Sequence, residues 1–63
     1  MNKYDLYIGK GLYCCCGSDC GNTYEVITDI YEKAGEEMFD IKDDDTGEIK
    51  SVSVDSLNEY SEY

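Results

Sequence analysis

Hydrophobic and polar positions alternate along much of this 63-residue chain, a pattern typical of short β-strands. The clearest strand is predicted over residues 23–31. Every second residue from Tyr24 onward falls on one side of it, whereas Ile27 and Tyr31 fall on the other. Because both faces carry apolar side chains, this strand is expected to lie wrapped within a barrel and not flat against solvent.

Further strands are predicted over residues 4–8, 38–42 and 49–54, and a compact apolar run occupies residues 12–16. Each of the three segments places its apolar residues on one face. In chain order these residues are Tyr4, Leu6 and Ile8, then Phe39 and Ile41, then Val52 and Val54.

Turn residues separate these segments. Residues 33–37 read as a turn, and the acidic run 43–48 reads as a hairpin connector, because Asp tolerates turn geometry and Gly47 supplies a positive φ. A helix over residues 29–37 is the weaker alternative, since its apolar stripe is narrow. Ser56 and Glu59 have capping-box spacing, so one helical or 3₁₀ turn is expected there, before a frayed end at residues 58–63.

This order of segments resembles the small Src-homology-3-like (SH3-like) β-barrel. The resemblance lies in an opening strand and bend, a long second strand, a tight acidic hairpin and a short turn before a last strand: residues 7–12, 24–27, 39–54 and 54–57. It implies a mostly β single domain over residues 1–63. The expected form is a small antiparallel barrel or twisted sheet of four to five short strands, with one short C-terminal helical turn. The chain has no Trp or Pro, so the aromatic groove of proline-peptide readers is not implied.

The charge of the chain is strongly skewed. Fifteen acidic residues against five lysines give a formal net charge of −10. Residues 1–28 carry three acids and two lysines, whereas residues 29–63 carry twelve acids and three lysines. A net charge of this size exceeds what a small domain needs for solubility, and its self-repulsion opposes compaction. The excess charge therefore indicates a surface presented to a basic partner. Direct binding to nucleic acid or to an anionic membrane is not expected.

Size and composition narrow the function further. A chain of 63 residues supports one thin core, and seven tyrosines favour a fold over disorder. No apolar run reaches the roughly 20 residues of a membrane span and no leader is evident, so a cytoplasmic location is expected. So small a domain offers no pocket to desolvate a catalytic carboxyl group, and we do not expect an enzyme.

Four cysteines cluster within seven residues: Cys14, Cys15, Cys16 and Cys20. Structural zinc sites usually join two separate cysteine arms, and this chain has one arm and no His. The favoured interpretation is that some thiols fill the core, with no cofactor bound. A cysteine-cluster zinc-binding mini-domain remains an alternative function.

The acidic connector does not match a helix-loop-helix calcium site, because Lys42 and Ser53 fall where the first and last acidic ligands belong. The predicted contact surface instead combines acids with tyrosines that can anchor an interface. Tyr7, Tyr13 and Tyr24 are expected in or beside the core, and Tyr63 at an interface. The partner-binding set is Tyr31, Glu36, Glu37, Asp40, Asp43, Asp44, Asp45, Glu48 and Tyr60.

By composition alone the chain is similar to small acidic bacteriophage proteins that inhibit host proteins, including nucleic-acid mimics and nuclease blockers. This similarity implies a non-enzymatic inhibitor or regulator in the cytoplasm of a bacterial host. The expected partner is a basic, nucleic-acid-binding protein whose cationic site the acids occupy. A structural adaptor that docks through an edge strand is a further alternative.

Overall fold

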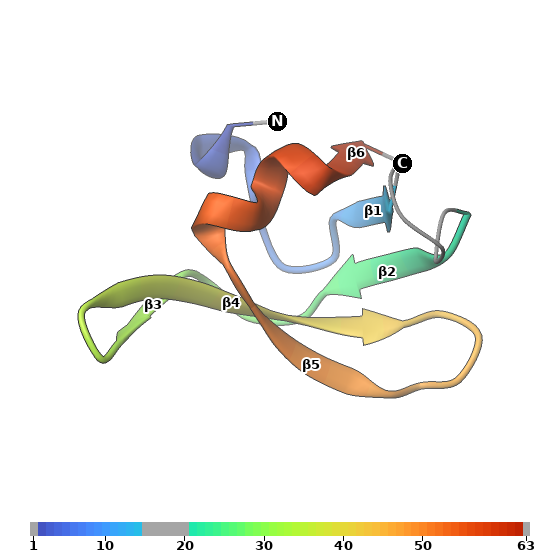
Figure 1. The fold of residues 1–63 in the computed structure, drawn as a ribbon. Helices are drawn as coiled ribbons and strands as arrows, with labels where there is room; N and C mark the ends of the chain where they lie inside the picture. Colours follow the sequence, from blue (N-terminus) through green and yellow to red (C-terminus); the bar gives the residue numbers. More distant parts are fainter. Residues whose placement is uncertain (1, 15–20, 63) are drawn as a thin grey trace.

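The computed structural model describes residues 2–14 and 21–62, and these form a mostly β structure with two short 3₁₀ helices (Figure 1). In chain order the elements are η1 (Lys3–Asp5), β1 (Gly11–Cys14), β2 (Thr23–Val26), β3 (Tyr31–Lys33), β4 (Glu36–Asp43), β5 (Ile49–Ser53), η2 (Val54–Glu59) and β6 (Tyr60–Glu62). Neither helix has the length and apolar composition that a membrane-crossing helix requires, within the residues described.

The six strands form one twisted antiparallel sheet, which confirms the predicted fold class. The strand order by pairing is β3-β4-β2-β1-β6. β2 and β3 pair with different parts of one side of β4, and β5 pairs with its other side. These pairings form an open path, so the twisted sheet describes the structure better than a closed barrel. The number of strands is six and not the four to five expected.

The core lies on one face of this sheet, under η2. It consists of Leu12, Tyr24, Val26, Phe39, Ile41 and Leu57. Phe39 and Ile41 are buried at alternate positions of β4, as their spacing predicted. Four of these side chains, those of Leu12, Val26, Phe39 and Ile41, are fully buried. Each stabilises the fold by about 1.5–3 kcal/mol, so the core is thin.

Two hairpins extend from the ends of β4. Ala34 and Gly35 both have positive φ, 55° and 78°, the arrangement of a two-residue turn that matches strand twist. In the β4–β5 turn, Gly47 has a φ of 76°, and its N–H donates to the Asp43 carbonyl at 2.8 Å. Both connectors were predicted from their turn residues.

The segment at residues 4–8 is not a strand, and this prediction was wrong. The Asn2 side chain accepts a hydrogen bond from the Tyr4 N–H at 3.0 Å, and the Asp5 N–H donates to the Asn2 carbonyl. These local bonds compete with strand pairing and start η1. As a result Tyr4 and Ile8 are exposed, and only Leu6 packs against the core.

The strand predicted over residues 23–31 is divided into β2 and β3. Both strands pair with β4, but at different positions along it. In the break between them the Thr28 hydroxyl accepts the Asp40 N–H at 2.9 Å, and Ile27 donates to the Asp40 carbonyl. Asp29, a poor strand former, lies in the same break.

The C-terminal region is more regular than expected. The cap of η2 is Ser53, whose hydroxyl accepts the Asp55 N–H at 3.2 Å, and not Ser56. A frayed end was predicted for residues 58–63; residues 60–62 form β6, which pairs with β1, and Tyr63 lies outside the described residues. The helical turn before a last strand, which the SH3-like resemblance implied, is therefore present.

Candidate functional site

The β4–β5 turn carries four predicted contact residues, which we call the turn acids: Asp43, Asp44, Asp45 and Glu48. The Asp43 carboxylate accepts the N–H groups of Asp45 and Thr46, at 2.7 and 3.1 Å. Its backbone N–H also donates to the Glu48 carbonyl at 2.8 Å. Asp43 therefore holds the turn in shape, while the other three side chains are exposed.

A second acidic group lies at the β3–β4 hairpin. We call its exposed members, Glu32, Glu36 and Glu37, the hairpin acids. Glu32 and Glu37 lie directly opposite each other across the strands, where like charges repel. The Lys3 ammonium is 2.9 Å from Glu37, and this contact raises the pKa of Lys3. Glu37 therefore already has a cationic partner within the chain.

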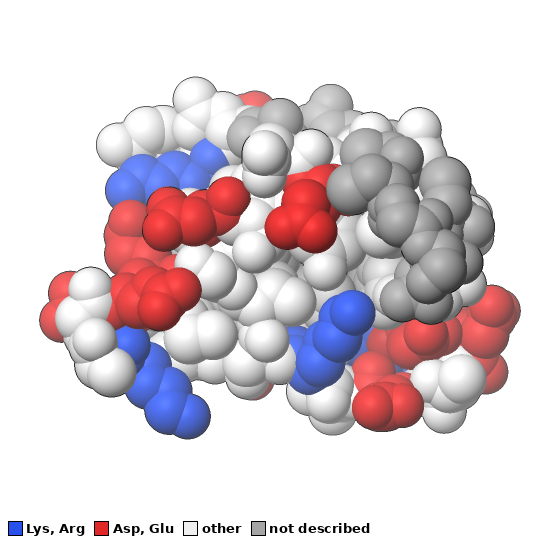
Figure 2. Space-filling model, in the orientation of Figure 1, with Lys and Arg blue, Asp and Glu red and all other residues white. Residues whose placement is uncertain are grey.

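The turn acids and the hairpin acids lie at opposite ends of β4. A strand rises about 3.3 Å per residue, so the ends of this eight-residue strand are separated by roughly 20 Å. Figure 2 shows acidic atoms over the β3–β4 hairpin on one side and over the β4–β5 turn on the other. The predicted contact acids at the two ends of β4 thus form two separate groups and not one continuous patch.

Asp40 and Tyr31 are brought together midway along β4, on the sheet face opposite the core. The Asp40 carboxylate accepts the Tyr31 hydroxyl at 2.5 Å and the Ser51 hydroxyl at 2.8 Å. These two hydrogen bonds, with Tyr31 the larger cause, lower the pKa of Asp40. Asp40 thus joins β3 and β5 to β4 through Tyr31 and Ser51. Asp40 and Tyr31 are therefore less available to a partner than the exposed turn acids.

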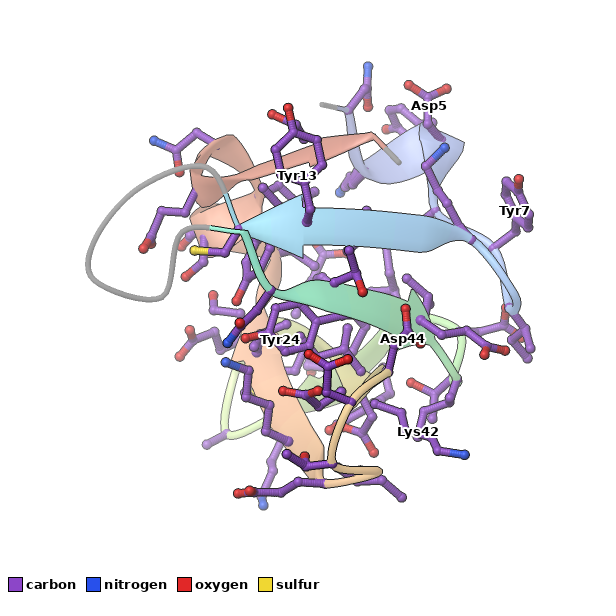
Figure 3. All side chains as sticks on the ribbon, turned by 90° about the vertical axis from the view of Figure 1, so that its right-hand side faces the viewer. Asp5, Tyr7, Tyr13, Tyr24, Lys42 and Asp44 are labelled. Atoms are coloured by element: carbon purple, nitrogen blue, oxygen red, sulfur yellow. The ribbon has the colours of Figure 1, made fainter. Side chains whose placement is uncertain are left out.

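The tyrosines divide differently from the prediction. Tyr24 is buried and Tyr13 half-buried. Tyr7 is 58% exposed and extends away from the sheet (Figure 3), so its expected place in or beside the core was wrong. Tyr60 packs against the core, with its ring edge-on to Tyr24 at a centroid distance of 6.1 Å. Burial raises the pKa of Tyr60. Tyr63 lies outside the described residues.

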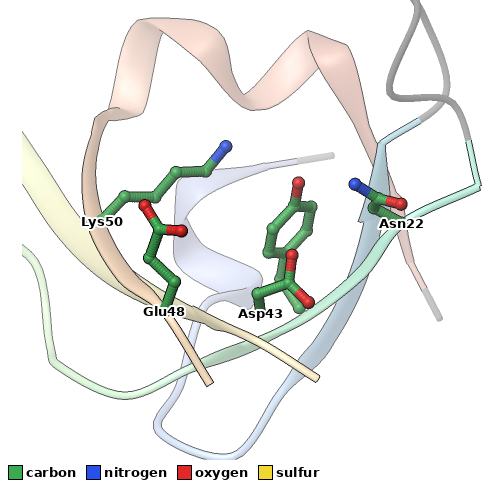
Figure 4. A pocket seen from close by; sticks show the side chains of 5 residues that line it. Asn22, Asp43, Glu48 and Lys50 are labelled. Atoms are coloured by element: carbon green, nitrogen blue, oxygen red, sulfur yellow. The ribbon is translucent and has the colours of Figure 1, made fainter. Parts of the chain in front are cut away.

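Beside the turn acids is a small hollow on the core face of the sheet (Figure 4), lined by Asn22, Tyr24, Asp43, Glu48 and Lys50. The Lys50 ammonium lies 4.7 Å from the centre of the Tyr24 ring, a cation–π distance. At about 170 Å³ the hollow is smaller than the roughly 300–1,000 Å³ of typical small-molecule sites.

Three residues of this hollow were missed by sequence reasoning: Asn22, Tyr24 and Lys50. Lys50 follows Glu48 by two residues and so lies near the turn acids through the hairpin itself. Tyr24 meets them through pairing between distant segments, in which it lies opposite Asp43, and no local pattern encodes that pairing. The turn acids themselves were found because they are adjacent in the sequence.

Of the cysteine cluster, only Cys14 is described. It is half-buried at the end of β1 and packs against the core. Cys15, Cys16 and Cys20 lie outside the described residues. Within residues 2–14 and 21–62, no group of three or more His, Cys, Asp or Glu side chains is arranged to hold a metal ion.

Comparison with protein-family models, with curated proteins and with solved structures found no match for this chain. A function must therefore be inferred from the side chains. Two exposed groups of carboxylates at the ends of one strand can attract and contact cations, and in the hairpin group Glu37 already pairs with Lys3.

Proposed function

We propose that this chain is a non-enzymatic inhibitor or regulator that binds a basic site on a nucleic-acid-processing protein. The turn acids are its principal contact. This activity is of the kind found in bacteriophage proteins that act in the host cytoplasm. The partner's lysines and arginines, which would otherwise contact phosphates, contact carboxylates instead.

The observation that carries this proposal is the display of Asp44, Asp45 and Glu48. All three are exposed on a turn that Asp43 and Gly47 hold in one conformation. A preorganised turn loses little entropy when it binds, so more of the electrostatic attraction is available for affinity. Clustered charges also accelerate association at low salt.

The hairpin acids provide a second contact at the other end of β4. Their separation from the turn acids, roughly 20 Å, corresponds to about twelve phosphate steps counted over both strands of a DNA duplex, at one charge per 1.7 Å. A partner that binds DNA along an extended basic groove can contact both groups at once. A partner with one compact basic pocket would contact the turn acids alone.

The test is a capture experiment with a matched pair of triple variants. Wild-type chain, D44N/D45N/E48Q and D5N/E25Q/D29N are immobilised and exposed to a bacterial lysate at 50 mM NaCl. Both variants lose three charges, but only the first removes the exposed turn acids. Bound proteins are then eluted with a duplex DNA oligonucleotide at constant salt and quantified.

We expect wild type and D5N/E25Q/D29N to retain the same DNA-eluted proteins, and D44N/D45N/E48Q to bind them about tenfold more weakly. Three exposed charge pairs at about 0.2–1 kcal/mol each account for a change of that size. Equal capture by the two variants, or capture that duplex DNA does not reverse, would contradict the proposal.

A further inference from the structure

β5 is a border strand of the sheet. It pairs along its whole length with β4, from the Lys42–Ile49 pair to the Met38–Ser53 pair. Its other edge pairs with no strand among the described residues, and Figure 1 shows β5 at the margin of the sheet. An unpaired edge offers backbone donors and acceptors to an incoming strand.

The register identifies which backbone groups face that free edge. The Asp43 N–H donates to the Glu48 carbonyl, so this opposed pair is a hydrogen-bonded one. Hydrogen-bonded pairs alternate with open pairs along antiparallel strands. Lys50 and Val52 therefore bond to β4, whereas Ile49 and Ser51 direct their N–H and C=O groups outward. The Ser53 N–H also faces outward, but its C=O, at the cap of η2, accepts the first bond of that helix.

The other borders of the sheet offer less. β3 has three residues, and the same alternation leaves only Glu32 facing outward. β6 also has three residues, and the Tyr60 N–H already donates to the Leu57 carbonyl. β5 is thus the longest free edge in the part of the chain that the structure describes.

Charge distinguishes the possible occupants of this edge. β5 itself has no acidic residue, but it starts immediately after the turn acids and is followed by the exposed Asp55. Its one lysine, Lys50, extends to the core face over Tyr24 and away from the outer face. An incoming strand therefore meets negative charge at both ends. A second copy, with a net charge of −10, is repelled.

We propose that the free edge of β5 binds an extended, Lys- or Arg-bearing segment of the basic partner by strand addition. The inference rests on the proposed function and specifies how the partner is held. Backbone hydrogen bonds from Ile49, Ser51 and Ser53 align the segment, and the turn acids and Asp55 contact its cationic side chains.

The probe is a synthetic eight-residue peptide in which Lys alternates with Thr, compared with the same peptide N-methylated at its central amides. Methylation keeps the charge but removes backbone donors. We expect the methylated peptide to bind at least tenfold more weakly by calorimetry. Amide exchange at Ile49, Ser51 and Ser53 is expected to slow at least tenfold on binding of the unmethylated peptide.

A variant pair tests the same edge from the protein side. Ser51→Pro removes an outward N–H while leaving the bonds of Lys50 and Val52 to β4, a position at which edge strands tolerate proline. Ser51→Ala is the control, since it removes the hydroxyl bond to Asp40 but keeps the N–H. S51P is expected to lose at least tenfold in peptide affinity relative to S51A.

Equal binding of both peptides, or no binding of either, overturns the inference, and so does a salt-induced dimer that pairs through β5. If the peptides bind equally while D44N/D45N/E48Q loses its captured proteins, strand addition fails and the proposed function stands. If capture does not depend on the turn acids, the proposed function itself fails. Because the peptide pair requires no mutation, misfolding of S51P does not obscure the result.

Discussion

At the scale of single residues, Asp40 and Asp44 show that acids in one strand and its turn have different roles. Asp40 lies midway along β4, and its carboxylate accepts hydrogen bonds from two hydroxyl groups on neighbouring strands. Asp44 is exposed in the turn, where only its backbone N–H, which donates to the Thr23 carbonyl, contacts another strand. Charge counts treat these two residues alike, but the first joins three strands and the second is presented to solvent.

The bond between Tyr31 and Asp40 makes stability depend on pH. Because hydrogen bonding lowers the folded pKa of Asp40 below its ordinary value of 3.8, the bonded carboxylate stabilises the fold above about pH 4. That contribution is lost as the pH falls through the lowered folded pKa. Tyr31→Phe should therefore cost about 1 kcal/mol at pH 7, and progressively less as the pH is lowered from about 4 toward 2.

The measurements are urea unfolding at pH 7 and pH 2 and an NMR titration of the Asp40 carboxyl carbon. In Y31F its pKa should rise toward the ordinary value. Tyr4→Phe is the matched control, because Tyr4 is 83% exposed and lies far from Asp40 in the sequence. A Y31F cost that is the same at pH 7 and pH 2 would show that the ring, and not the hydroxyl bond, supplies the stabilisation.

At the scale of elements, local patterns predicted the β4–β5 hairpin best. Phe39 and Ile41 alternate with polar residues, and the acidic run with Gly47 is a turn sequence, so strand, core face and connector could all be predicted. The prediction failed where side chains bond to nearby backbone. The Asn2 side chain bonds to the nearby Tyr4 N–H, and the strand predicted over residues 4–8 does not form. The Thr28 hydroxyl bonds across to the Asp40 N–H, at the point where the long predicted strand is divided.

The candidate site was predictable only in part, because its arrangement depends on which strands pair. Adjacent acids in the turn are visible in the sequence, but their distance from the hairpin acids depends on the length of β4 and on which strands pair. The free edge of β5 likewise depends on the sheet order, in which β2 and β3 occupy one side of β4 and β5 the other. Pairing between segments far apart in the chain has no local sequence signal.

Within the β4–β5 turn, the Asp43 carboxylate bonds to the backbone, whereas the other turn acids are exposed. The Asp43 carboxylate accepts two backbone N–H groups, and an Asn side-chain oxygen can accept the same bonds. Asp43→Ala should therefore lower the free energy of unfolding by about 1 kcal/mol, whereas Asp43→Asn should lower it by less than half as much. Thermal unfolding of both variants, with Asp44→Ala as the control, measures the difference.

Equal destabilisation by D43A and D43N would mean that the negative charge of Asp43, and not its acceptor geometry, maintains the turn. D44A should have little effect on stability, because the Asp44 side chain is exposed and its cross-strand bond is made by the backbone. Asp43 can therefore be excluded from binding variants, and only the exposed turn acids changed.

At the scale of the whole molecule, the net charge is −10 and the longest extent is 30 Å, so repulsion between the acidic side chains destabilises the folded state. Much of this charge lies in the turn acids and the hairpin acids. The ion pair of Lys3 with Glu37 offsets part of it. A thin core must therefore hold together ends that carry like charges.

Because repulsion opposes the thin core, removing the charges of the exposed turn acids should raise stability and weaken binding to a basic partner. D44N/D45N/E48Q reduces the formal charge from −10 to −7, so at 10 mM NaCl it should be more stable than wild type by about 0.5–1 kcal/mol. For a domain of this size that raises the melting temperature by about 2–8 °C. At 500 mM NaCl, where the Debye length falls to about 4 Å, the two melting temperatures should converge. Circular dichroism melts across the salt series measure this, and a wild-type melting temperature that does not rise with salt would show that repulsion between these acids is not what limits the fold.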